Sequence, residues 1–252
     1  MTLLLPRLAV LLNSMDAGRV NPSEAEHALA GQVHLVEDPE QRLGLGHHPT
    51  LRLAMAQMPR LPGPGGWVLA LVTPGRLGGL RGPAALNQSA LASVPEPELG
   101  AVAVVLRHDG LLAWQAAAAI PEEESVDEEV LSLVLSGAER PLSPATPTEA
   151  GRQLAQVMAA STAALEAMAV AAGRRPDPAA TVQLGGSYPA SSQVLLDQAM
   201  TVLAVVEAAH RWEAELPHSH AVTSRSGALA SLRAAALDAV QAAVSWPTHL
   251  MV

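Results

Sequence analysis

The sequence predicts an α+β protein, with a small, mostly antiparallel sheet, N-terminal helices before it and a C-terminal three-helix bundle after it. Short apolar runs bounded by Gly and Pro occur in the first half of the 252-residue chain, and such runs are typical of buried strands. An Asp-Gly pair separates two of these runs, as in a β-hairpin. After residue 140 the chain is Ala-rich, and apolar residues recur at helical spacing.

Two short helices are expected at the amino terminus, over residues 3–15 and 22–30. The second has a well-specified start, because Asn21 is a typical N-cap, Pro22 suits the first helical position and Glu24 follows three residues after the cap. We expect these helices to pack on the sheet.

The next segment mixes irregular and helical sequence. Residues 33–46 are polar and predict no regular element, whereas residues 50–58 predict a helix that ends at Pro59. The stretch RLPGPGG that follows is a chain breaker. The first strand is therefore expected only after it.

Three or four strands are expected, and the middle two form a hairpin around His108-Asp109-Gly110. The last strand has an alternative, because Ser125 and Glu128 before it imitate a capping box and would favour a helix. The predicted strands cover residues 67–72, 101–107, 111–119 and 130–136. The acidic run between residues 122 and 129 predicts a solvated loop.

Three long helices are expected in the second half of the chain. The first begins at Thr146, which is followed by Pro147 and, at the third position, Glu149. It is expected to end at Gly173, and the other two cover residues 190–216 and 227–245, each stopped by a proline. We therefore divide the chain into an α+β domain, residues 1–140, and a helical bundle, residues 141–252, which could pack as one unit with the first.

Composition excludes several classes of function. The formal net charge is −9 and the chain has no basic run beyond Arg174-Arg175, so we expect no nucleic-acid partner. With no Cys, the protein has no disulfide, thiolate metal site or cysteine nucleophile. The chain lacks Lys and Phe and has one Tyr and one Ile, which indicates a high-GC genome rather than an adaptation to phosphate.

The amino terminus, MTLLLPRLAVLLNSMD, does not match a signal peptide. No basic segment precedes the apolar run, and Pro6 and Arg7 interrupt it. No window of about 18 apolar residues is apparent, so no membrane span is expected. The expected location is cytoplasmic.

Residues 67–91 and 146–175 resemble a group of actinobacterial proteins of unknown function. The shared features are an apolar strand, a turn of the LRGP kind, here Leu80-Arg81-Gly82-Pro83, and a short helix rich in Ala, Leu and Asn. These two segments make up about a fifth of the chain. It implies a strand–loop–helix order and a high-GC source, and it carries no activity, cofactor or site residue.

One candidate binding site is the Gly- and Arg-rich stretch from Thr73 to Asn87. It follows a predicted strand and opens a predicted helix at Pro83, where backbone N–H groups and the helix dipole attract anions. It matches neither the Walker A nor the dinucleotide-binding pattern, and the simpler interpretation is a tight turn. The candidate anion-binding residues are Arg76, Gly78, Gly79, Arg81 and Gly82.

A second candidate site is a metal site on the helix over residues 190–216. Glu207 and His210 lie one helical turn apart, as in di-metal carboxylate bundles. Such pairs also arise by chance, as Glu24 and His27 illustrate, and a helix-edge ion pair is the simpler interpretation. The other carboxylates considered as ligands are Glu166 and Asp238.

The remaining histidines and serines give no catalytic pattern. His218 and His220 are expected in a loop after Pro217, and two imidazoles without a third ligand make a poor zinc site. No GxSxG motif is present. Enzyme activity is therefore left open, with a non-catalytic protein favoured and no cofactor expected.

The leading functional hypothesis is a non-catalytic interaction or accessory protein that binds a protein partner, or itself, through apolar helical surfaces. It depends on the width of the apolar faces, on which Leu196, Met200 and Leu203 are expected to exceed what one bundle can bury. The alternatives are a protein that binds, or acts on, an anionic small molecule at residues 73–87, and a metal-dependent bundle that uses Glu207 and His210.

Overall fold

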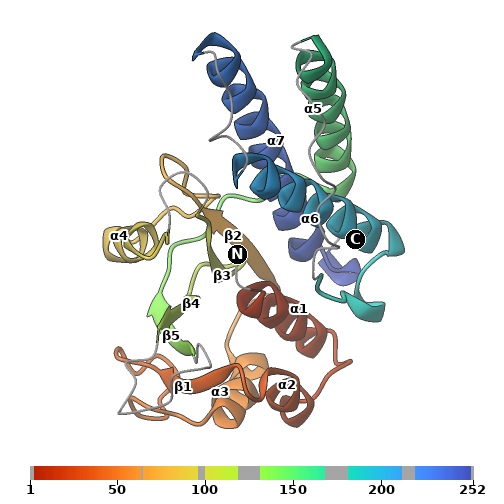
Figure 1. Ribbon diagram of the computed structural model, residues 1–252. Coiled ribbons are helices and arrows are strands. Elements are labelled where there is room, and N and C mark those ends of the chain that lie inside the picture. The colour runs from red at the N-terminus through yellow and green to blue at the C-terminus, as the bar shows by residue number, and fades with distance from the viewer. Residues whose placement is uncertain are drawn as a thin grey trace.

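The computed structural model describes residues 3–63, 65–95, 100–118, 131–167, 181–211 and 219–250. Within them the chain forms seven α-helices and one five-stranded sheet (Figure 1). The helices are α1 Leu4–Asp16, α2 Pro22–Leu29, α3 Leu51–Gln57, α4 Ala84–Ala92, α5 Pro147–Ala167, α6 Ala190–Arg211 and α7 Ser219–Ser245. The strands are β1 Val33–Glu37, β2 Trp67–Val72, β3 Val102–Arg107, β4 Leu112–Ala118 and β5 Leu131–Gly137.

The sheet has the strand order β1-β5-β4-β3-β2. The pairs β2–β3, β3–β4 and β4–β5 are antiparallel, and β1 lies parallel to β5. The predicted α+β class and mostly antiparallel sheet are therefore confirmed, as is the hairpin at His108-Asp109-Gly110. The interpretation of residues 130–136 as a strand rather than a helix is also confirmed, because β5 occupies Leu131–Gly137.

One detail of the predicted α+β half is wrong. Residues 33–46 were expected to be irregular, but Val33–Glu37 forms β1 at one edge of the sheet. Its register with β5 shifts between Val33 and Leu35, so the pairing is irregular at the start of the strand. The helix expected over residues 50–58 is confirmed as α3, which ends at Gln57 and is followed by one 3₁₀ turn over Met58–Arg60.

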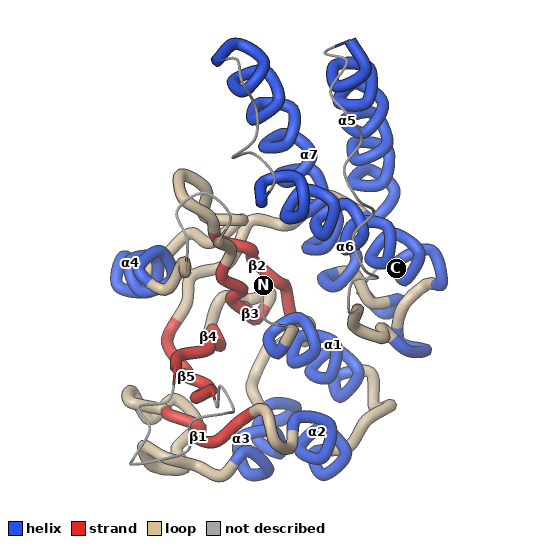
Figure 2. Tube along the Cα trace, viewed as in Figure 1, coloured by secondary structure: helices blue, strands red, loops and turns tan. Residues whose placement is uncertain are grey.

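The two faces of the sheet are covered by different helices (Figure 2). Helix α1 packs across β2, β3 and β4, and the main core gathers on its side around Trp67 and Trp114. A smaller core lies on the opposite face, where Leu86 and Ala90 of α4 cover Val72 and Val104. Both faces are buried, which explains why β2 is apolar at all six positions.

The helix starts follow the predicted capping chemistry. The side chain of Asn21 accepts hydrogen bonds from the backbone N–H groups of Ser23 and Glu24, both at 3.0 Å, and the Glu24 carboxylate accepts one from the N–H of Asn21 at 2.8 Å. Thr146 and Glu149 form the same reciprocal arrangement at the start of α5. These boxes satisfy N–H groups that have no partner within their own helix.

In the predicted three-helix bundle, α7 is the central member. It packs along both α5 and α6, and its carboxyl-terminal part also contacts β2 (Figure 1). One boundary was predicted wrongly: α7 begins at Ser219 rather than at residue 227, so His220 lies in its first turn and not in a loop. The predicted ends of the other two helices, Gly173 and residue 216, lie outside the described residues.

Candidate functional site

The Gly- and Arg-rich loop before α4 folds as a set of tight turns. The backbone N–H groups of Thr73 and Arg76 each donate to the carbonyl oxygen of the other, at 2.8 and 2.9 Å. This turn projects the Arg76 side chain towards α7, where its guanidinium pairs with the carboxylate of Asp238 and lies 3.4 Å from the carbonyl oxygen of Ala234. Arg76, one of the two candidate anion-binding cations, thus already has an acidic partner.

Close packing requires a glycine at position 78, and backbone hydrogen bonds of Gly79 and Gly82 hold the rest of the loop in place. A Cβ on Gly78 would overlap the backbone of Leu71, and one on Gly82 would lie 2.7 Å from a carboxylate oxygen of Glu139. The carbonyl oxygens of Gly79 and Gly82 accept hydrogen bonds from Leu142 and Glu139, at 2.9 and 3.0 Å. These contacts dock the loop on the chain that follows β5.

The surroundings of the loop are acidic as well as basic. Arg81 is exposed, but the carboxylates of Glu139 and Asp238 lie against the same loop. Pro83 is the N-cap of α4 rather than its first residue, and it offers no side-chain hydrogen bond there. Each of Arg76, Gly78, Gly79 and Gly82 has a structural role, and anion binding at this loop stays a prediction.

Glu207 and His210 lie on α6 with Glu207 exposed and His210 half-buried. Both already interact with other groups of the protein. Glu207 is close to Arg233 of α7; burial lowers the pKa of Arg233, and the Glu207 charge opposes that shift.

The other carboxylates considered as metal ligands have separate partners or positions. Glu24 belongs to the capping box of α2, Asp238 pairs with Arg76, and Glu166 is exposed on α5. Among the described residues, no three His, Asp or Glu side chains come together as metal ligands. His218 lies outside those residues. The metal site stays a prediction.

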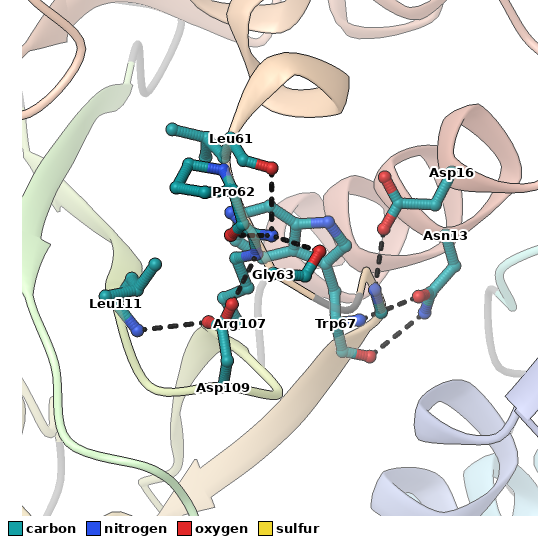
Figure 3. A network of polar contacts seen from close by, with 10 residues as sticks. Asn13, Asp16, Leu61, Pro62, Gly63, Trp67, Arg107, Asp109 and Leu111 are labelled. Carbon is teal, nitrogen blue, oxygen red and sulfur yellow. Dashed lines mark hydrogen bonds and ion pairs between the residues drawn. The ribbon is translucent and has the colours of Figure 1, made fainter.

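The sequence did not indicate a buried polar cluster where α1, the loop 61–66 and the end of β3 meet (Figure 3). The Arg107 side chain is 3% exposed, and its Nη2 donates to the carbonyl oxygens of Leu61, Pro62 and Gly63 at 3.3, 2.8 and 3.3 Å. Its Nε lies 3.3 Å from Oδ2 of Asp109, an ion pair without hydrogen-bond alignment. No motif marks an arginine at a strand end for this role.

Asp16 forms the other side of this cluster. Its Oδ2 accepts a hydrogen bond from the backbone N–H of Gly66 at 2.7 Å. Burial raises the pKa of Asp16, and the Gly66 N–H and the Arg107 charge partly offset that rise. Arg107 and Asp16 together fix the breaker segment that leads into β2, which is a structural role.

The outward surface of α5 and α6 differs from the one expected. Leu196, Met200 and Leu203 were expected to exceed what the bundle can bury, but their side chains belong to the main core. The exposed apolar residues of α6 are instead Val194 and Val205, at 67% and 44%. They share one face with Gln198 and Thr201, which are also exposed.

Helix α5 continues this surface. The Nε2 of Gln198 lies 3.5 Å from Sδ of Met158, so the outer face of α6 meets α5. From Gln153 to Leu165 the sequence QLAQVMAASTAAL contains no charged residue. Only Leu154 and Ser161 of this stretch are buried, and Ser161 faces α7, where its Oγ lies 3.5 Å from the carbonyl oxygen of Ala228.

By length and composition, one helix within the described part of the chain could cross a membrane. It is Ala190–His210 of α6, of which 39% of the most apolar window is buried. The expectation of no membrane span stays a prediction. Core helices of soluble proteins meet the same criterion.

No protein-family model, no curated protein and no solved structure matches this chain.

Proposed function

We propose that this protein is a non-catalytic interaction protein, and that it binds a protein partner through the joined outer faces of α5 and α6. The observation that carries the proposal is the uncharged stretch from Gln153 to Leu165, most of which is solvent-exposed. Folded surfaces usually carry about 25–35% charged residues. Three turns of exposed helix without a charge are costly for solubility and suit a surface that another protein covers.

The adjoining face of α6 supports the same proposal. Val194, Gln198, Thr201 and Val205 follow one another at steps of three and four residues, and all four are exposed and uncharged. Apolar side chains flanked by hydrogen-bonding ones are the composition of a helix that packs on a partner helix. The four positions thus extend the uncharged surface of α5 across a second helix.

The test is site-specific photocrosslinking in the native host. A photoreactive amino acid replaces Val194 or Val205 on α6, or Ala163 on α5, and the matched control is Leu111 in the β3–β4 turn, which is 46% exposed. We expect discrete crosslinked species from the helix positions and none from Leu111. Val205→Glu combined with the crosslinker at Val194 should remove them, because burying an unpaired carboxylate in the contact is unfavourable.

The proposal fails if the helix positions give no discrete species. It also fails if Leu111 gives the same species as Val194 and Val205, since the surface would then not be distinguished from an ordinary exposed turn.

A further inference from the structure

We propose that the occupant of the α5 face is a second copy of this chain, with the two α5 helices packed antiparallel about a two-fold axis at Ala159. This inference rests on the proposed function and names its partner. Five exposed residues of α5 define what we call the α5 stripe: Arg152, Ala155, Ala159, Ala163 and Glu166. Steps of three and four residues place them on one face of the helix.

The α5 stripe faces away from the rest of the bundle. Leu154 and Ser161, which are buried towards α7, lie five residues before and two residues after Ala159, on the opposite side of the helix. All five stripe residues are exposed. Nothing in the described part of the chain therefore has to move for a second helix to reach them.

The ends of the α5 stripe carry opposite charges at equal distances from its centre. Arg152 lies seven residues before Ala159 and Glu166 seven residues after it. An antiparallel pair centred at Ala159 thus brings Arg152 of each copy opposite Glu166 of the other, about 10 Å from the crossing point. Within the described residues neither side chain has an ion-pair contact within 4 Å, and the Arg152 charge acts only at longer range, as the smallest of the influences that lower the pKa of Glu149 on the same helix.

The centre of the stripe suits close approach between two acidic molecules. Each copy carries a formal charge of −9, so most surfaces of two copies repel each other. Alanines at positions 155, 159 and 163 bring no charge into the contact and allow an interaxial distance of about 8 Å. Antiparallel packing also places the helix dipoles in favourable opposition.

Cysteine crosslinking tests this geometry directly, because the chain has no cysteine of its own. In the full-length protein, Ala159→Cys should form a disulfide-linked dimer under mild oxidation, since the two Cβ atoms lie near the axis. The control is Ala164→Cys, which is exposed on the same helix but turned away from the stripe. We expect at least tenfold faster crosslinking at position 159 than at position 164.

Reversing the charges of Arg152 and Glu166 provides a second test of the dimer, which needs no introduced cysteine. Sedimentation of the cysteine-free protein should show a concentration-dependent dimer. Arg152→Glu or Glu166→Arg alone should weaken it roughly tenfold, because each change replaces two attractions by two repulsions. The double variant R152E/E166R should restore it, since the pairing is then only reversed.

A chain that stays monomeric at all accessible concentrations overturns the dimer, as do equal crosslinking at positions 159 and 164 or a double variant that stays weak. Failure here is separable from failure of the proposed function. A monomeric chain that still gives discrete adducts with a different protein at Val194 and Val205 loses only the dimer, whereas loss of those adducts as well removes the interaction surface itself.

Discussion

Gln241 of α7 hydrogen-bonds to the outer edge of β2: its Oε1 accepts a hydrogen bond from the backbone N–H of Leu71 at 2.9 Å. Its Nε2 donates to the carbonyl oxygen of Gly78 at 3.1 Å. One turn later, Oγ of Ser245 accepts from the N–H of Leu69 at 3.0 Å. At the start of the strand, Asn13 of α1 bonds both the N–H and the carbonyl oxygen of Trp67, at 2.8 and 3.0 Å.

These side chains replace a neighbouring strand at an edge that would otherwise be open. An unpaired strand edge can recruit other chains, and proteins usually blunt it with charges or prolines. Here α1 and α7 cover it, so β2 can be apolar at every position and still end the sheet. The same bonds attach the helical half of the chain to the sheet.

Replacing Gln241 by Leu should destabilise the protein by about 1–3 kcal/mol, because the buried N–H of Leu71 and carbonyl of Gly78 lose their partners. Chemical denaturation followed by circular dichroism measures the change. The matched control is Gln153→Leu on the exposed side of α5, for which we expect a change within about 0.5 kcal/mol. Equal losses for the two variants would show that the edge bonds contribute nothing.

Gly78→Ala should be more destabilising than Gly75→Ala. Both glycines have positive φ, +58° and +77°, so each alanine has the cost of a left-handed conformation, about 1 kcal/mol. A Cβ at Gly75 meets nothing within 4 Å, whereas one at Gly78 overlaps the Leu71 backbone. Thermal unfolding of the two variants separates the steric cost from the conformational one.

If the two alanine variants melt at the same temperature, the close approach of Gly78 to β2 is not a constraint. The glycines of this loop would then again need another explanation, such as the predicted anion site.

Much of the fold could be predicted because its signals are local. The run WVLALV, the Asp-Gly hairpin and the capping residues Asn21 and Thr146 each specify an element from neighbouring residues, and all are confirmed. Strand β1 could not be predicted, because its partner β5 lies about 100 residues away in sequence and its five residues include His34 and Glu37. Nothing local distinguishes it from a loop.

The sequence indicates that a helix face is buried more reliably than it indicates which element covers that face. Leu196, Met200 and Leu203 made the apolar face of α6 look wider than one bundle needs, but the structure uses them all in the core. Periodicity gives the face of a helix and not how many neighbours cover it. For the same reason, the sequence placed the exposed apolar surface of α6 at residues that are in fact buried. The surface that supports the proposed function consists of other residues of α5 and α6.

Asp16→Asn should remove a pH dependence from the stability of the protein. The pKa of Asp16 is raised above 3.8, chiefly by burial. Between 3.8 and the raised value, the folded chain binds more protons than the unfolded chain, so ionised Asp16 costs stability above this window and the cost disappears as the pH falls through it. Asparagine keeps an acceptor for the Gly66 N–H but never ionises.

We therefore expect the variant to gain most over the parent near neutral pH, with the difference shrinking as the pH falls towards 3.8. Melting temperatures of both proteins across that range give the comparison, and Asp197→Asn on the exposed face of α6 controls for the substitution itself. A difference that does not vary with pH would contradict the burial of the Asp16 charge.

Thr146→Ala should destabilise α5 more at neutral pH than at low pH. The Thr146 hydroxyl donates to Oε2 of Glu149 at 2.7 Å, and this bond, with one from the Thr146 N–H, lowers the pKa of Glu149 below 4.5. A lowered carboxyl pKa contributes stability above pH 4.5, and this stability is lost as the pH falls through the pKa of the folded state.

The control is Thr148→Ala, which changes a neighbouring exposed threonine without a capping bond. The difference in denaturation midpoint between Thr146→Ala and the parent should therefore shrink on acidification to the part due to the lost bond from the Glu149 N–H, whereas Thr148→Ala should follow the parent throughout. A constant difference for Thr146→Ala would show that its hydroxyl caps the helix without the Glu149 charge.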